Sequence, residues 1–390
     1  MSTGDATRIT PREMIDKLVA IPTVSRDSNL PLIHFVRDYL AEQGVEARLV
    51  HSEDGNKANL YATVGPPEDG GVVLSGHTDV VPVEGQEWDT DPFVPIERNG
   101  RLYGRGTADM KSFIAIGLAL VPEMRERGLK KPIHLALSYD EESGCTGAPS
   151  MIEEMVHTVP PPRAVIVGEP TSNRIVTAHK GFAKFDTIVR GHEVHASQVH
   201  RGVSAVMVAA RLVTFLEDMM RENMARADPD SPFEPPFTTI HTGVIHGGTA
   251  HNIMARDCRF VTDIRSIPDD DPMTFIQRYK AHIEKEVVPA MHRIAPETGV
   301  NVDIHLQVPG LKPEEGGEAA TLVKSLTGKG DARAVAYASE AGQFQEAGYS
   351  VVLYGPGSID QAHQPNEYIE LSQVEEGIAF ARRLIDRLAD

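Results

Sequence analysis

Short apolar runs alternate with longer segments of helical periodicity in the first half of the chain. The runs at 72–74, 133–137 and 164–167 are bounded by Gly or Pro and predict buried strands. Residues 111–127 (KSFIAIGLALVPEMRER) repeat apolar positions with a helical period, and Gly128 follows as a stop signal. Alternation of strand, helix and strand predicts an α/β fold with a mainly parallel sheet that is covered on both faces.

The pattern changes near residue 181. The elements predicted after it are a strand at 184–189, a helix at 204–220, a Pro-rich loop at 221–236, strands at 238–245 and 258–264, and a helix at 272–286. This order is typical of an α+β domain. From residue 311 the α/β pattern returns, with a strand at 350–354. We therefore predict an α+β domain at 182–308, inserted into an α/β domain that is formed by 1–181 and 309–390.

Composition narrows the class of protein. The 390 residues are 41% hydrophobic and 24% charged, and 38 basic against 56 acidic residues give a formal net charge of -18. Nucleic acids and anionic membranes require basic surfaces, so we expect neither as a partner. The two cysteines, Cys145 and Cys258, argue against a disulfide framework. Because residues 1–17 lack the apolar region of a signal peptide, we expect a cytoplasmic protein.

Histidines and carboxylates gather in five short stretches at predicted strand ends or helix starts, where sites form in open α/β sheets. The stretches are SGHTD (75–79), GRGTADMK (104–111), SYDEESG (138–144), VGEPT (167–171) and QAHQPNE (361–367). Any one of them alone also fits ordinary structure, such as a core histidine or an aspartate that caps a helix. Together they offer two histidines and three carboxylates, a ligand set that suits zinc, cobalt or manganese.

The spacing of residues within the stretches suggests different roles for neighbouring side chains. His77 and Asp79 are two residues apart, so in an extended segment they point to the same side, and Asp79 could orient a metal-bound imidazole. Glu141 and Glu142 repel each other unless a cation lies nearby; one could bind metal while the other takes a proton from metal-bound water. Asp109 follows two glycines at a helix start, and its two oxygens could bridge two metal ions.

In this order the motifs resemble the metal-site motifs of the M20 family of di-zinc aminoacylases and deacetylases, over nearly the whole chain. The resemblance implies a di-zinc exopeptidase-like catalytic domain with an inserted lid or dimerisation domain. It also implies two divalent metal ions, with Zn²⁺ expected and Co²⁺ or Mn²⁺ as alternatives. His77 and Glu169 would bind one ion, Glu142 and His363 the other, and Asp109 would bridge both.

The same resemblance implies amide hydrolysis, in which a metal-activated water attacks the amide carbonyl. Glu141 would be the general base, and Asp79 would orient or tune His77. In the inserted domain, His195 of the stretch GHEVHAS matches a histidine that helps to stabilise the tetrahedral intermediate, often from a neighbouring subunit. We therefore expect a homodimer.

The implied substrate is a small N-acyl amino acid. Arg265 and Asn252 match family segments and could hold its carboxylate, and Lys180 is a further anion-binding candidate. Relatives that remove a succinyl group carry an arginine where this chain has Gln343, and the uncharged residue favours a neutral acetyl group. The strings TVSRDSNLPLI, NKANLYATVGP and EAGQFQ are most similar to family members that deacetylate N-acetylornithine in arginine biosynthesis.

Other functions remain open at this point. Within the family, a succinyl-diaminopimelate desuccinylase, a broader N-acyl-amino-acid amidohydrolase or a dipeptidase would share the same motifs. A non-catalytic amino-acid-binding relative should have lost Glu141 or a ligand, and this chain has lost neither. A metal-dependent phosphatase would need a Gly-rich phosphate loop or an Arg and Lys cluster near the motifs, which the sequence lacks.

Overall fold

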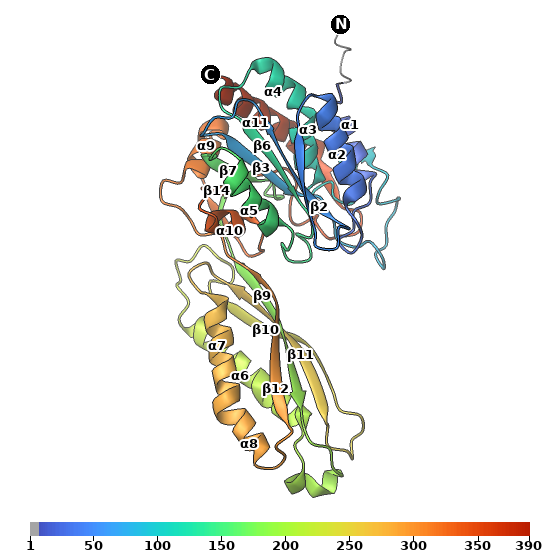
Figure 1. Cartoon of the computed structure of the whole chain (residues 1–390), viewed down its shortest axis with the longest axis vertical. Helices are drawn as coiled ribbons and strands as arrows, with labels where there is room; N and C mark the ends of the chain where they lie inside the picture. Colours follow the sequence, from blue (N-terminus) through green and yellow to red (C-terminus); the bar gives the residue numbers. More distant parts are fainter. Residues whose placement is uncertain (1–7) are drawn as a thin grey trace. The chain divides into compact units, whose positions relative to one another are not determined.

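The computed structural model of the protein describes residues 8–390. Of the segment 1–17, on which the expectation of no signal peptide rests, residues 1–7 lie outside the described residues. The described residues form two compact units, coloured by sequence in Figure 1. The first unit contains the described residues up to Ala178, Pro313–Arg333 and Ser339–Asp390; the second contains His179–Lys312 and Ala334–Ala338. No helix in the described part of the chain is long and apolar enough to cross a membrane.

The larger sheet has eight strands in the order β1-β2-β6-β3-β7-β14-β8-β13, and its residues belong to the first unit except for His179 of β8 and for Ala334 and Val335 of β13. Its strands are β1 (Ala47–His51), β2 (Ala58–Val64), β3 (Val72–His77), β6 (Ile133–Ser138), β7 (Ala164–Val167), β8 (Val176–His179), β13 (Arg333–Val335) and β14 (Val351–Leu353). The four central strands β6, β3, β7 and β14 pair in parallel, whereas β2 and β8 flank them antiparallel. The predicted mainly parallel α/β fold is thus confirmed, within a sheet that is mixed as a whole.

Helices lie against both faces of this sheet (Figure 1). They are α1 (Pro11–Val19), α2 (Leu30–Glu42), α3 (Lys111–Ala119), α4 (Val121–Arg127), α5 (Ala148–Thr158), α9 (Glu318–Thr327), α10 (Ala341–Glu346) and α11 (Leu371–Ala389). The prediction of a single helix at 111–127 is wrong, because the helix is interrupted at Leu120, which separates α3 from α4. Pro122 has no backbone N–H to continue the ladder, so it starts a new helix. Gly128 ends α4, as predicted, and the structure shows that it does so in the left-handed conformation.

A small three-stranded sheet of order β15-β5-β4 completes the first unit. It consists of β4 (Ile96–Arg98), β5 (Arg101–Tyr103) and β15 (Tyr368–Glu370). β15 pairs antiparallel with β5, so that Tyr368 lies opposite Tyr103. This pairing brings the C-terminal stretch beside the loop that leads to Asp109.

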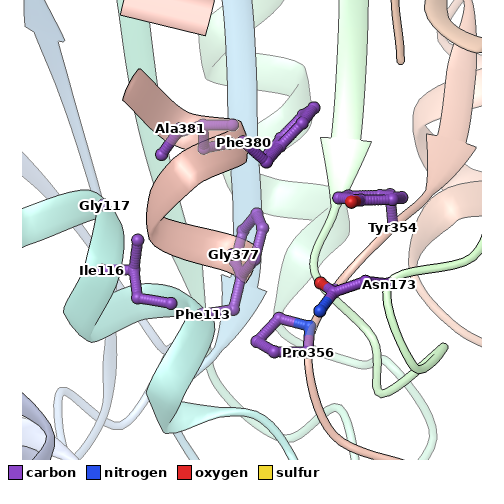
Figure 2. Close-up of a pocket in the computed structure, with 11 residues that line it drawn as sticks. Phe113, Ile116, Gly117, Asn173, Tyr354, Pro356, Gly377, Phe380 and Ala381 are labelled. Atoms are coloured by element: carbon purple, nitrogen blue, oxygen red, sulfur yellow. The ribbon is translucent and has the colours of Figure 1, made fainter. Parts of the chain in front are cut away.

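The main core of the first unit is apolar and continuous. Figure 2 shows a small cavity within it, between α3, α11 and the end of β14. Phe113, Ile116, Tyr354 and Phe380 line this cavity, and the rings of Tyr354 and Phe380 pack with centroids 4.5 Å apart. Its lining is almost entirely apolar, so the cavity belongs to the core and offers no ligand set.

The second unit is an antiparallel sheet of order β10-β11-β9-β12. Its elements are β9 (Gly181–Arg190), a 3-10 helix (Ala196–Arg201), α6 (Ala205–Ala225), β10 (Thr239–Gly247), β11 (Asp257–Ser266), α7 (Pro272–His282), a π-helical turn (Ile283–Val287), α8 (Val288–His292) and β12 (Gly299–Val308). α6 and α7 pack on one face of the sheet. α6 continues to Ala225, five residues beyond the predicted end at 220, because apolar and helix-favouring residues persist into the predicted loop.

Candidate metal centre

The candidate ligands lie where neighbouring parallel strands end. β3 and β6 pair so that His77 lies opposite Ser138, and the chain then turns into Glu141 and Glu142. Glu169 follows β7, which pairs with β3 on its other side. The register of the central sheet therefore gathers three of the five stretches at one edge, as strand order in open α/β sheets predicts.

Asp109 lies between two histidines. Its Oδ1 is 3.0 Å from Nε2 of His77, and its Oδ2 is 3.5 Å from Nε2 of His363. The same Nε2 of His363 lies 2.9 Å from Oε2 of Glu142. Each carboxylate oxygen of Asp109 therefore faces a different imidazole, which is the arrangement that a bridging ligand requires.

Two groups of side chains could each hold a cation. The atoms of His77, Asp109 and Glu169 lie within 4.8 Å of one another, and so do those of Asp109, Glu142 and His363. These are the two ligand sets, with a shared Asp109, that the family resemblance implies. His77 donates its Nδ1 proton to the backbone oxygen of Asp79 at 2.9 Å, so Nε2, which faces Asp109, is the nitrogen that would bind an ion.

The donor set fits a cation on chemical grounds. Glu169 is 4% exposed, and its Oε1 has no hydrogen-bond partner among the described residues. A buried carboxylate oxygen without a donor is costly unless a positive charge completes its surroundings. Burial, reinforced by the charges of Glu141 and Asp109, raises the pKa of Glu169 well above its usual range. Two divalent ions would supply the missing charge.

The pKa values of the other candidate ligands also indicate a site that favours positive charge. Burial and the charge of Asp109 raise the pKa of Glu142 to about 6. Burial acts against ionisation of Asp109 also, but its hydrogen bonds with His363 and His77 hold its pKa well below the usual range. Hydrogen bonds with Asp109 and Glu142 raise the pKa of His363 to about 10. The surrounding carboxylates thus favour positive charge at this place, which protons on the imidazoles supply and which bound cations would supply in their stead.

Glu141 and Asp79 occupy the positions beside this cluster. Burial of its carboxyl group raises the pKa of Glu141 to about 8, and Cys145 Sγ donates to its Oε1 at 3.3 Å. The carboxylate of Asp79 lies 3.7 Å from Nδ1 of His77, too far for a hydrogen bond. It accepts instead from Ser25 Oγ at 2.7 Å and from the backbone N–H groups of Glu141 and Glu142. Asp79 therefore positions the acidic loop, through contacts that sequence alone did not indicate.

A further buried carboxylate, Glu340, was not predicted. It accepts hydrogen bonds from Ser75 Oγ and Ser138 Oγ, both at 2.6 Å, and is 1% exposed. Ser75 lies on β3 and Ser138 ends β6, so Glu340 joins the ends of the two strands that present His77 and the acidic loop. Its only signal in the sequence is that it is the first residue of the EAGQFQ string, and no apolar pattern marks it as buried.

The loop of His363 carries backbone strain. His363 has a φ of 63°, and Asn366 a φ of 58°, in the left-handed region that non-glycine residues rarely adopt. Gln86 Nε2 donates to the backbone oxygen of His363 at 2.8 Å, and Asn366 Oδ1 accepts from the N–H of Asp89. Strain of this kind persists where surrounding contacts impose it, and it is frequent at functional sites.

The predicted residues of the second unit are partly brought together. The segments of His195 and Asn252 run side by side, since Ala196 N donates to the Asn252 backbone oxygen at 2.9 Å. Nδ1 of His195 accepts from the N–H of Ser197 at 3.2 Å, so its ring proton is on Nε2. His195 and Asn252 are both exposed.

Three predicted substrate contacts have protein partners. Arg265 donates to Asp263 at 3.2 Å, and its guanidinium carbon lies 4.0 Å from the ring centroid of Phe182. Lys180 donates to the backbone oxygens of Pro235 and Phe237 at 2.7 and 2.8 Å. In the first unit, Gln343 Nε2 donates to the Cys145 backbone oxygen at 2.9 Å, and Gln343 Oε1 is buried without a partner among the described residues. Their contacts with substrate stay predictions.

Known proteins resemble this chain along its length. The acetylornithine deacetylase of Myxococcus xanthus is 35% identical over 375 residues, which cover 93% of each chain. Among solved structures, aminopeptidase PepT from Bacillus cereus matches with a TM-score of 0.75 at 18% identity, covering 100% of both chains. The YXEP protein of Bacillus subtilis, described as a dinuclear metal binding peptidase of the M20 family, matches with a TM-score of 0.63 at 14% identity and covers 97% of both chains.

The sequence similarity to acetylornithine deacetylases over most of the chain indicates a hydrolase that acts on amide bonds. The model of peptidase family M20/M25/M40 matches residues 73–387, and the chain belongs to this family. The resemblance that the motifs carried is thereby confirmed.

Proposed function

We propose that this amide hydrolase removes the acetyl group from N-acetylornithine in a metal-dependent reaction. The observation that carries the proposal is the shared carboxylate of Asp109, which turns one oxygen toward each of two ligand groups. The 35% identity with an acetylornithine deacetylase over nearly the whole chain supports the acetylated substrate. The uncharged Gln343 supports an acyl group without a second carboxylate.

The metal assignment follows the two ligand groups. His77 and Glu169 would hold one divalent ion, Glu142 and His363 the other, and Asp109 both. Zn²⁺ suits this nitrogen and oxygen ligand set, as do Co²⁺ and Mn²⁺. When bound, two such ions would polarise the amide carbonyl and lower the pKa of water.

Within this arrangement Glu141 acts as general base. Cys145 Sγ donates to Oε1 of its carboxylate, and this carboxylate takes the proton of the attacking water. As the water oxygen bonds to the carbonyl carbon and the C–N bond breaks, Glu141 returns the proton to the leaving amine nitrogen. The products are acetate and the free amine. Asp79 holds the backbone of Glu141 and Glu142 in place during these transfers.

The second unit offers groups that suit the rest of the substrate. Nε2–H of His195 is a donor that suits the developing oxyanion, because the neighbouring Nδ1 already accepts from Ser197. Arg265 is half-exposed and Asn252 is exposed, so both have donors for the carboxylate of an amino acid.

We further propose that the protein forms a homodimer through the second unit. β10 is an edge strand, with one side of its backbone unpaired within the described sheet. Apolar side chains lie exposed around it: Val199 (63%), Val206 (37%), Met207 (61%), Val244 (47%), Ile245 (49%) and Ile253 (38%). An edge strand that pairs with its own copy about a two-fold axis would cover these residues.

A substrate panel tests the proposal directly. Purified protein is assayed with N-acetylornithine, N-succinyl-diaminopimelate and a set of dipeptides, before and after removal of metal with a chelator and after addition of Zn²⁺ or Co²⁺. We expect the highest kcat/KM for N-acetylornithine, loss of activity with the chelator, and recovery with metal. Faster hydrolysis of the succinylated substrate or of a dipeptide would replace this substrate assignment with the corresponding alternative.

A further inference from the structure

A buried glutamate outside both ligand groups holds the loop of Asp109. Oε1 of Glu367 accepts hydrogen bonds from three backbone N–H groups, those of Gly106 at 3.1 Å, Ala108 at 2.8 Å and Asp109 at 3.1 Å. Glu367 is 1% exposed. One carboxylate oxygen therefore fixes the backbone on both sides of the turn that presents Asp109.

The charge of Glu367 is compensated by Arg105, which is also 1% exposed. Arg105 donates from its terminal guanidinium nitrogen to Oε2 of Glu367 at 2.6 Å, and it donates to Gln86 Oε1 at 2.5 Å. Its guanidinium carbon lies 5.2 Å from the ring centroid of Trp88. One oxygen of Glu367 thus serves the backbone and the other serves Arg105, so both oxygens are engaged by donors of the protein itself.

The same residue links two ligand loops. Glu367 lies four residues beyond His363 and directly precedes β15, which pairs with β5. The N–H of Gly104 donates to the backbone oxygen of Glu367 at 2.9 Å. Gln86 accepts a hydrogen bond from Arg105 and donates one to the backbone oxygen of His363. The ion pair of Arg105 and Glu367 is therefore connected to the His363 loop as well.

We propose that Glu367 is a positioning residue of the metal centre, which sets Asp109 and His363 in register so that both ions bind tightly. This inference rests on the proposed metal-binding role of Asp109 and His363. A carboxylate that only stabilised the fold would need no particular relation to the two ligand loops. Glu367 bonds the backbone of Asp109 itself and lies on the segment of His363, and outer contacts of this kind govern ligand orientation and metal affinity.

The test compares three variants in the full-length protein. Glu367→Gln keeps an acceptor oxygen but not the charge, and Glu367→Met removes the acceptor. The double variant Arg105→Met with Glu367→Met removes the acceptor but leaves no unpaired buried charge, so it guards against simple unfolding. Zn²⁺ affinity of both sites is measured by chelator competition, the Co²⁺ absorption spectrum reports ligand geometry, and thermal unfolding of the metal-free protein reports stability.

We expect Zn²⁺ affinity at both sites to fall at least tenfold in Glu367→Met and less in Glu367→Gln, with an altered Co²⁺ spectrum. The double variant should recover the melting temperature of the metal-free protein without recovering affinity. A matched control is Glu314→Gln. Glu314 also accepts a hydrogen bond from a backbone N–H, that of Val351, but within the described part of the chain it does not contact the loops of Asp109 and His363. Glu314→Gln should leave the affinity for Zn²⁺ unchanged.

Two results would overturn the inference in distinguishable ways. If the double variant binds Zn²⁺ as tightly as the wild-type protein, or if only the melting temperature changes, Glu367 stabilises the fold and does not position the ligands. If the wild-type protein itself binds fewer than two ions, the metal assignment fails, and this inference fails with it.

Discussion

Nε2 of His77 lies 3.0 Å from Oδ1 of Asp109, a contact that leaves Oδ2 of the same carboxylate free to face the second ligand group. This relationship makes Asp109 the one residue that both groups share. The chemistry of the site should depend on its two equivalent oxygens more than on any other ligand.

Replacement of this bridge should disrupt both ions together. Asp109→Asn keeps one oxygen and substitutes an amide nitrogen, which cannot coordinate a second cation. We expect metal content to fall from two ions per chain to one or fewer, and kcat/KM to fall more than about 100-fold. Elemental analysis and steady-state kinetics measure the two effects. Asp91→Asn, at an exposed aspartate of the same unit, should change neither; two retained ions in Asp109→Asn would contradict the bridging role.

Glu141 should be needed for turnover and dispensable for metal binding. Glu141→Gln removes the proton acceptor but preserves the shape of the side chain, so kcat should drop by about 10²–10⁴-fold. Metal content should stay near that of the wild-type protein. Glu153→Gln, an exposed position on α5, serves as the control. Substantial activity in Glu141→Gln would remove this residue from the proposed mechanism.

The acyl preference should respond to residue 343. Gln343→Arg keeps a donor for the Cys145 backbone oxygen and adds a positive charge. We expect the ratio of kcat/KM for N-succinyl over N-acetyl substrates to rise about tenfold or more, because a cation can bind the second carboxylate. Gln343→Leu separates loss of the Cys145 contact from gain of charge. An unchanged ratio in Gln343→Arg would place the acyl group away from this residue.

The proposed dimer should be sensitive to charge beside the edge strand. Met207 on α6 is 61% exposed and lines a hollow with Val199, Val206 and Ile253. Met207→Glu would bury an unpaired carboxylate in the interface, and sedimentation velocity should then show monomers where the wild-type protein is dimeric. Met224→Glu, at an exposed position near the other end of α6, is the comparison. A wild-type monomer would refute the dimer.

A buried histidine should make stability depend on pH. Burial lowers the pKa of His134 to about 4 from 6.5, and its Nε2 has no partner among the described residues. The unfolded chain protonates this imidazole below about pH 6.5, but the folded protein does so only near pH 4. The free energy of unfolding therefore keeps its full value above about pH 6.5. It decreases by at most about 3 kcal/mol as pH falls from there to about 4, because the unfolded chain takes up the proton and the folded protein does not.

Denaturant unfolding of the metal-free protein from pH 7 to pH 4.5 measures this effect. His134→Gln cannot take up the proton, so its free energy of unfolding should fall less steeply with decreasing pH than that of the wild-type protein. Equal slopes for the two proteins would show that His134 titrates normally in the folded state.

Local sequence pattern predicted much of the fold, because buried strands and amphipathic helices carry their own signals. The runs at 133–137 and 164–167 match β6 and β7 to within one residue. The helix predicted at 111–127 failed because one proline outweighed an otherwise continuous helical period. The antiparallel flanks of the central sheet were not predicted either, since strand order depends on long-range packing.

In the candidate site, too, some features could be predicted from the sequence and others could not. The ligands could be proposed because they belong to short motifs with a known chemical logic. The supporting roles of Glu340 and Glu367 could not be proposed, although both residues lie in the quoted stretches, because they act through contacts with Ser75, Arg105 and backbone groups that are distant in the sequence. Nothing in the local pattern separates a buried carboxylate of this kind from an exposed one. Only the fold brings its donors to it.

The contact between Glu142 and His363 joins residues that are 221 positions apart along the chain. The whole of His179–Lys312 lies within the interval that this contact closes. The ion that Glu142 and His363 would bind closes a long chain loop, so occupancy of that site and closure of the loop are thermodynamically linked. Release of metal should then loosen the C-terminal ligand loop first, and proteolytic cleavage near residue 363 becomes a readout of metal occupancy that requires no substrate.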